Sequence, residues 1–290
     1  MLFALRPGAF AQNGGSTAIA AEDMERLHAV EDSMVVMVDS MYAGFIPDLR
    51  TGYCEKFVRQ LVRALKIPNS YTYPFDKLKT KINIIGPDDN SFRIFDWVIM
   101  PSEAVHRYYG AIQMQGEQLK LYPLVDYTAE LGRNAPDSEL TNSKWFGALY
   151  YRIMPREVNG QKIYTLFGLN ESNPETKRKV LDPLIITENG PVFGSKIFRG
   201  GNNISNQYRF ILEYKKTVQA SMNWDDERQL IFFDHLVSQT NDPNRKYTYV
   251  PSGQYDGFKW RNNEWEYVED LIPVQNLRDG EAPSGDQPAK

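Results

Sequence analysis

The segment Phe258-Lys259-Trp260-Arg261-Asn262-Asn263-Glu264-Trp265-Glu266-Tyr267 decides the fold of this chain. Its central Asn262-Asn263 pair suits a two-residue type I′ turn, which joins antiparallel strands. One register then places aromatic residues opposite each other on one face and opposite charges on the other. The expected pairs are Phe258 with Tyr267, Trp260 with Trp265, Lys259 with Glu266 and Arg261 with Glu264. The segment therefore predicts a β-hairpin with one aromatic face.

The same construction recurs along the chain. Turn signals at Gly116-Glu117, Asn159-Gly160 and Asn189-Gly190 separate alternating runs, and Trp224–Gln229 gives a looser one. Consecutive hairpins make neighbouring strands antiparallel. The expected cross-strand neighbours are Met114 with Leu119, Ile112 with Leu121, Gln113 with Lys120, Glu157 with Lys162, Ile153 with Leu166, Ile186 with Phe193, and Asp225 with Arg228.

Four further strand-like runs complete a mainly β chain: Ser91–Ile99, Tyr208–Tyr214, Leu230–Leu236 and Lys246–Val250. Together these runs give roughly a dozen strands, and no helical pattern lies between them to form a parallel crossover. The first run is apolar on both faces, which is typical of a strand between two layers. We therefore expect an α+β fold in which a long antiparallel meander forms a sandwich or a curled sheet, with a partial β-propeller as the alternative.

Two amphipathic helices precede the strands. Apolar residues recur at steps of three and four over Glu22–Ala43, and Ser16 or Thr17 is available as a cap. A second stripe follows Thr51 and includes Cys54, which we interpret as a core residue rather than a reactive thiol. We expect a helical segment at 16–80, an antiparallel β domain at 81–272 and a disordered tail at 273–290.

The N-terminus indicates export. Ala9-Phe10-Ala11, followed by Gln12, is a small-x-small triplet of the kind that signal peptidase cuts after. No basic cluster precedes it and the apolar run is short, so we expect residues 1–15 to be a truncated signal or leader segment. The periplasm or the exterior is the expected location, with the cytoplasm as the alternative.

The composition excludes several classes of function. The net charge of −4, from 33 basic and 37 acidic residues, argues against nucleic-acid binding. One Cys rules out an internal disulfide, and three widely separated His residues do not make a Cys/His zinc site. No apolar run reaches the length of a transmembrane segment.

Catalytic signatures are absent from the sequence. Neither a P-loop nor a GxGxxG after a strand occurs, and there is no GxSxG for a serine hydrolase. His235 lies beside Asp234, but adjacent strand residues point to opposite faces, so the two need a bulge to form a dyad. We interpret His235 as structural or exposed on a rim. Asp225–Glu227 and Asp88–Asn90 are interpreted as turns rather than a glycosidase pair or a calcium loop. We therefore assign no catalytic, cofactor-binding or metal-binding residue.

The aromatic surplus, 13% of the chain, is the one feature that suits binding. Such side chains stack on sugars or anchor protein partners, although a core role is favoured in a sheet protein of this size. The residues concerned are Tyr108-Tyr109, Trp145, Tyr150-Tyr151, Trp260 and Trp265.

Several strand sequences resemble exported Bacteroidetes proteins of unassigned function. They are Ser91–Trp97, Tyr164–Gly168, Pro191–Gly194, Arg209–Tyr214, Phe233–Leu236, Tyr249–Gly253 and Tyr255–Phe258. The likeness covers roughly residues 80 to 270 and implies a cell-envelope setting, with no chemistry attached. We expect an exported, non-catalytic scaffold that binds an envelope protein or glycan. The alternative is a secreted hydrolase acting on polysaccharide or peptide, with acids that only the fold brings together.

Overall fold

A computed structural model describes residues 18–102, 105–201 and 204–271. Its helices are α1 (Ala21–Ala43), α2 (Pro47–Leu65) and α3 (Thr128–Leu131), with short 3₁₀ helices at Ser70–Thr72, Leu78–Thr80, Gly132–Asp137, Asn142–Lys144 and Lys246–Thr248. Its strands are β1 (Asn83–Ile85), β2 (Phe92–Ser102), β3 (Val105–Met114), β4 (Leu121–Val125), β5 (Leu140–Thr141), β6 (Leu149–Val158), β7 (Gln161–Asn170), β8 (Thr176–Thr187), β9 (Gly190–Phe193), β10 (Phe198–Arg199), β11 (Phe210–Lys215), β12 (Met222–Asp225), β13 (Leu230–Ser238), β14 (Tyr249–Arg261) and β15 (Glu264–Val268).

The described residues form two compact units. The first contains residues 18–95 and 111–122, and the second contains residues 96–110 and 123–271. The domain boundaries drawn from the sequence stay a prediction. The candidate site described below lies wholly within the second unit.

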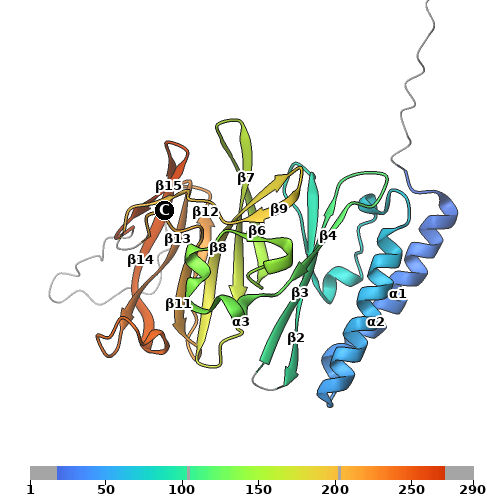
Figure 1. Cartoon of the computed structure of the whole chain (residues 1–290), viewed down its shortest axis with the longest axis horizontal. Coiled ribbons are helices and arrows are strands. Elements are labelled where there is room, and N and C mark those ends of the chain that lie inside the picture. The colour runs from blue at the N-terminus through green and yellow to red at the C-terminus, as the bar shows by residue number, and fades with distance from the viewer. Residues whose placement is uncertain (1–17, 103–104, 202–203, 272–290) are drawn as a thin grey trace, which may run out of the picture. The chain divides into compact units, whose positions relative to one another are not determined.

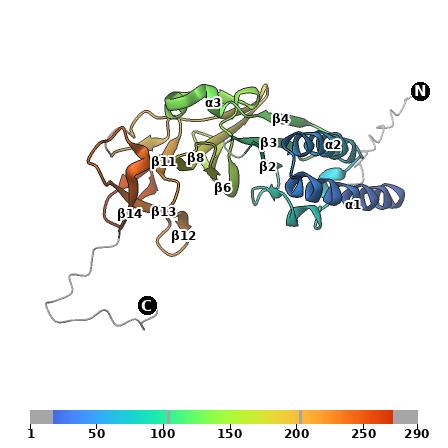
Figure 2. The ribbon, with the colours of Figure 1, turned by 90° about the horizontal axis from the view of Figure 1, so that it is seen from below.

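The two helices of the first unit lie side by side (Figures 1 and 2). The predicted apolar stripe of α1 is buried, as Leu27, Met34 and Val38 are, and Cys54 of α2 is a buried core residue as expected. Helix α2 begins at Pro47, earlier than predicted, because proline suits the first turn of a helix. The proposed caps Ser16 and Thr17 lie outside the described residues. None of the helices in the described ranges is long and apolar enough to cross a membrane.

A four-stranded sheet has the order β1-β2-β3-β4. Strand β2 is internal, and residues on both of its faces are buried, as predicted. The turn at Gly116-Glu117 differs from the expected register. The amide of Met114 donates to the carbonyl of Lys120, one residue beyond the predicted partner Leu119.

The second unit is an open sandwich of two sheets. One sheet has the order β5-β9-β8-β7-β6, with β11 also paired to β8, and the other has the order β10-β15-β14-β13-β12. Apolar side chains from both sheets, including Phe167, Leu181, Phe233 and Phe258, form one core cluster. The sandwich interpretation of the sequence is therefore confirmed, and the propeller alternative is not.

Two predicted hairpin registers are confirmed. Strands β14 and β15 pair through Asn262-Asn263, with Trp260 opposite Trp265, and both asparagines have positive φ angles, of 50° and 66°. Strands β6 and β7 pair through Asn159-Gly160 with Glu157 opposite Lys162. The charged residues of the first hairpin are also paired in the register as predicted, Lys259 opposite Glu266 and Arg261 opposite Glu264, although Arg261 forms its ion pair with Glu266 at 3.6 Å.

Two other registers are corrected. At Asn189-Gly190 the turn lies one residue earlier, so that Ile186 faces Pro191 instead of Phe193. The Thr187 hydroxyl stabilises this turn by accepting the Asn189 amide. In the β12–β13 turn, Asp225 faces Leu230 rather than Arg228.

One parallel pair also departs from the all-antiparallel expectation. Strand β10 runs parallel to β15, with Phe198 opposite Trp265. Strands β11 to β14 lie between them in the sequence, so a long connection rather than a crossover helix brings them together.

Candidate functional site

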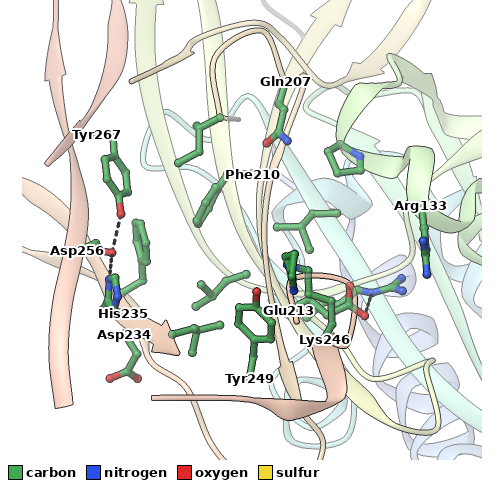
Figure 3. Close-up of a pocket in the computed structure, with 18 of the residues that line it drawn as sticks. Arg133, Gln207, Phe210, Glu213, Asp234, His235, Lys246, Tyr249, Asp256 and Tyr267 are labelled. Atoms are coloured by element: carbon green, nitrogen blue, oxygen red, sulfur yellow. Dashed lines mark hydrogen bonds and ion pairs between the residues drawn. The ribbon is translucent and has the colours of Figure 1, made fainter. Parts of the chain in front are cut away.

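A pocket of about 520 Å³ opens beside strands β11, β13 and β14. Figure 3 shows its residues: His235 and Asp256 lie on one side, and Arg133 lies on the other. Its apolar wall is the edge of the sandwich core, from which Phe210, Leu212 and Phe233 reach the pocket. Its remaining walls come from the Gly132–Asp137 segment and from the loop that precedes β14.

The polar centre of the pocket is a chain of three side chains. Nδ1 of His235 lies 2.7 Å from Oδ2 of Asp256, and the Tyr267 hydroxyl donates to the same oxygen at 2.6 Å. Burial, and then the hydrogen bond to Asp256, raise the pKa of Tyr267, so this phenol keeps its proton and acts as the donor. Asp256 is buried, whereas the His235 side chain is 39% exposed.

The carboxylate fixes how the imidazole can react. Because an ionised carboxylate only accepts hydrogen bonds, Nδ1 of His235 carries the hydrogen in this pair. The neutral imidazole then has its free lone pair on Nε2. The arrangement provides an oriented hydrogen-bond acceptor, which is also the geometry of a general base.

The strand register makes this pairing possible. Asp256 lies opposite Phe233, and His235 is on the same face of β13 as Phe233, so the imidazole and the carboxylate are diagonal neighbours. The register of β13 against β14 shifts between Asp234 and Leu236, with His235 at the irregular position. Asp234, the acid next to His235 in the sequence, instead accepts the amide of Ser221 at 2.5 Å. The expectation that His235 and Asp234 form no dyad is consistent with this geometry, but His235 does acquire an acidic partner, from the neighbouring strand.

The rim of the pocket is cationic. Arg178 is neutralised by Glu213, with Nε 3.1 Å from Oε1. Exposed Arg133 and Lys246 have no ion pair with any residue in the described ranges, and the Lys246 ammonium lies 4.3 Å from the centre of the Tyr249 ring. An apolar wall with two unpaired cations at its edge suits a ligand that has an apolar or ring-shaped body and an anionic group.

The other residues considered from the sequence have structural roles. Asp225 accepts the backbone amides of Glu227 and Arg228, and Asp89 accepts the amide and hydroxyl of Ser91, as turn residues do. The aromatic residues divide as expected for a core: Tyr108, Trp145, Tyr150 and Trp265 are buried, while Tyr109 and Trp260 are partly buried and Tyr151 is 38% exposed.

The sequence reasoning missed Asp256 and Tyr267. A signal for the first was present, because Asp256 shares strand parity with Phe258 and Trp260 and so interrupts an apolar, inward face with an acid. The pairing of β13 with β14 that places His235 on the same face as Asp256 leaves no comparable mark in the sequence.

Within the described part of the chain, no group of three or more His, Cys, Asp or Glu residues could hold a metal ion. Comparison of the chain with protein-family models, with curated proteins and with solved structures finds no match.

Proposed function

We propose that the protein is a binding protein and that the pocket beside β11, β13 and β14 is its ligand site. The observation that carries the proposal is the pocket of about 520 Å³, whose apolar wall ends at two unpaired cations. A ligand with an apolar or ring-shaped body fits against Phe210 and Phe233, and its anionic group lies toward Arg133 and Lys246. His235, held by Asp256, contributes a directed hydrogen bond.

We place this binding protein in the cell envelope, as an exported scaffold whose partner is an envelope protein or a glycan. The Ala9-Phe10-Ala11 triplet and the resemblance to exported Bacteroidetes proteins support this location. Expression with the native N-terminus, followed by mass spectrometry of the periplasmic fraction, tests it. A mature chain that begins at Gln12 supports export, and an unprocessed chain confined to the cytoplasm contradicts it.

The ligand site is tested with 8-anilinonaphthalene-1-sulfonate, an aromatic probe with one anionic group. We expect a saturable fluorescence increase with the full chain. The double variant Arg133→Glu/Lys246→Glu should weaken binding at least about tenfold, since both rim cations become repulsive. Lys56→Glu/Lys66→Glu, on α2 and at its C-cap, makes the same charge change elsewhere and should bind as the parent does. Equal affinity of the rim and control variants would overturn the assignment.

The second candidate is a hydrolase, and the His235–Asp256 pair is the observation that favours it. In this case Nε2 of His235 removes a proton from water, which attacks the substrate. Binding is preferred because the apolar wall and the rim cations need only a ligand, whereas hydrolysis by activated water also needs a general acid for the leaving group, and Glu213 of the lining is paired with Arg178. Incubation with polysaccharides and peptides decides between them. Turnover that falls at least about a hundredfold in Asp256→Asn supports hydrolysis, and the absence of turnover supports binding.

A further inference from the structure

A caged arginine lies at an edge of the sandwich, away from the residues that line the pocket above. Arg156 of β6 places its guanidinium carbon 5.1 Å from the ring centre of Trp265, 5.3 Å from that of Trp224 and 5.8 Å from that of Trp260. These are three of the five tryptophans in the chain. Their rings also meet edge to face, with centres 4.9 Å apart for Trp260 and Trp265. The cage holds the guanidinium in place by cation–π contact.

The charge of Arg156 has no counter-ion in the part of the chain that the structure describes. Among the described residues no carboxylate forms an ion pair with it, its only hydrogen bond runs from Nη1 to the Pro155 carbonyl at 3.0 Å, and buried Nε has no partner. Arg209, by contrast, is fully buried and paired with Asp182 at 2.9 Å. A half-buried cation without an anion is unfavourable, and a ligand carboxylate would offset that penalty. Burial accordingly lowers the pKa of Arg156.

A hollow of about 370 Å³ is lined not by the cage residues themselves but by residues that neighbour Arg156 and Trp265. It lies between the β6–β7 turn and the β14–β15 turn. Ile163, which lines the hollow, faces Arg156 in the strand register, and the carbonyl of Ile197, another lining residue, accepts the Trp265 amide at 2.6 Å. The polar lining is rich in amides: Asn159, Gln161, Asn262 and Asn263, with Ser195, Lys196 and Glu264.

We propose that this end of the sandwich is a second binding site, for a sugar that carries a carboxylate, such as a hexuronate unit of an acidic polysaccharide. The guanidinium binds the carboxylate through its unused N–H groups. The partly exposed Trp260 provides an apolar ring face on which a sugar ring stacks. Amide side chains donate and accept hydrogen bonds at once, which matches the hydroxyl groups of a sugar. This site is independent of the proposed function of the first pocket.

The probe is the trimer of galacturonic acid, with the neutral trimer of galactose as its counterpart. Binding to the full chain is measured by tryptophan fluorescence and by calorimetry. We expect saturable binding of the acidic trimer that is at least about tenfold tighter than that of the neutral trimer, because only the acidic one supplies a carboxylate to Arg156. Equal affinity for the two trimers, or no binding of the acidic one, would overturn the proposal.

Variants separate this site from general charge effects. Arg156→Gln should weaken binding of the acidic trimer at least about tenfold. Arg228→Gln, which removes one charge from the exposed β12–β13 turn, should leave the affinity for this trimer unchanged. Asn159→Asp covers the case in which Arg156→Gln fails to fold. Asn159 is exposed in the turn with a φ of 52°, a conformation that Asp tolerates. The added negative charge should weaken binding of the acidic trimer at least about threefold, and an unchanged affinity for this trimer would count against the site. The rim variant Arg133→Glu/Lys246→Glu should bind this trimer as the parent does.

Discussion

Asp256 accepts hydrogen bonds from His235 and Tyr267 through one oxygen, Oδ2, and His235 lies on the adjacent strand where its register against β14 shifts. The carboxylate thus joins β13, β14 and β15 at the place where they line the pocket. Its other oxygen accepts the amide of Asp270 at 3.4 Å. Asp256 therefore orients the imidazole and links three strands by hydrogen bonds.

Removal of this acceptor should destabilise the fold. Asp256→Ala leaves the Tyr267 hydroxyl and the His235 N–H without their acceptor, which we expect to lower the free energy of unfolding by about 2 to 3 kcal/mol. Asp256→Asn keeps one acceptor oxygen and should lose about 1 kcal/mol. Urea unfolding followed by tryptophan fluorescence measures both. Glu227→Gln, in an exposed turn, is the control. A loss below about 0.5 kcal/mol for Asp256→Ala would show that the three-residue chain contributes little.

The hairpins show which parts of this fold local sequence determines. The β14–β15 register could be predicted because turn residues and the aromatic and charge patterns agree on one alignment at Asn262-Asn263. The β8–β9 register was wrong because Pro191, which has no N–H, directly follows the expected turn, and the chain turns one residue earlier instead. Where the turn residues are the only indication of the register, a nearby residue such as Pro191 can shift it.

The candidate site was less predictable than the fold. His235 and Asp256 are distant in sequence and meet only through the pairing of β13 with β14, which sets Asp256 opposite Phe233. Arg156 likewise reads as an ordinary polar residue of an alternating strand, and its tryptophan neighbours come from the opposite sheet. Sequence periodicity assigns a residue to a face, whereas these sites depend on which faces pack together.

A fully buried ion pair holds one wall of the pocket. Nε of Arg209 lies 2.9 Å from Oδ1 of Asp182, and its other nitrogens donate to the carbonyls of Ala135, Ser138 and Phe193. The first carbonyl belongs to the Gly132–Asp137 segment, which carries Arg133, and the second belongs to the residue that follows it. Arg209 therefore connects the rim of the pocket to the sheet.

Arg209→Met should lower the free energy of unfolding by about 3 to 5 kcal/mol, because it leaves Asp182 buried without its counter-ion. The matched control is Arg228→Met, which breaks an exposed pair with Asp225 at 3.6 Å and should lose less than about 0.5 kcal/mol. Chemical denaturation gives both values. Equal losses in the two variants would contradict the structural role assigned to Arg209. We also expect the Arg209→Met chain to bind the anilinonaphthalene probe more weakly.

Two glycines should respond to alanine in opposite directions. A Cβ atom on Gly257 would lie 2.2 Å from the carbonyl oxygen of Ile231, in the adjacent strand, so Gly257→Ala must displace backbone. Gly52, inside α2, has open space around the same position. Gly257→Ala should therefore destabilise by about 2 kcal/mol or more, and Gly52→Ala should stabilise by about 0.5 to 1 kcal/mol. A melting temperature of Gly257→Ala that is unchanged or raised would contradict the close approach at Gly257, and a lowered one for Gly52→Ala would contradict the open space at Gly52.

The acid sensitivity of the fold should depend in part on His106. Burial, and then the nearby Lys216 ammonium, lower the pKa of His106, while Glu171 opposes the shift. No residue in the described part of the chain forms a hydrogen bond with its buried Nδ1. As the pH falls below the usual histidine pKa of about 6.5, the unfolded chain binds a proton that the folded chain resists. The contribution of His106 to the free energy of unfolding is therefore fully present above that pH. It decreases as the pH falls, until the pH is below the lowered pKa of His106 in the folded chain.

His106→Gln should flatten this pH dependence. Between about pH 7.5 and about pH 5, the parent chain should lose more of its free energy of unfolding than the variant does, by roughly a few tenths of a kcal/mol because the ring is only partly buried. Lys216→Met should have the same effect to a smaller degree, since it removes the second cause of the shift while burial remains. Urea unfolding at several pH values gives the slope of the free energy of unfolding against pH for each protein. The slopes can be compared even if the variants differ from the parent in stability at neutral pH. If the slopes of His106→Gln and the parent coincide, the folded chain binds a proton at His106 as readily as the unfolded chain, and the acid sensitivity must come from other groups.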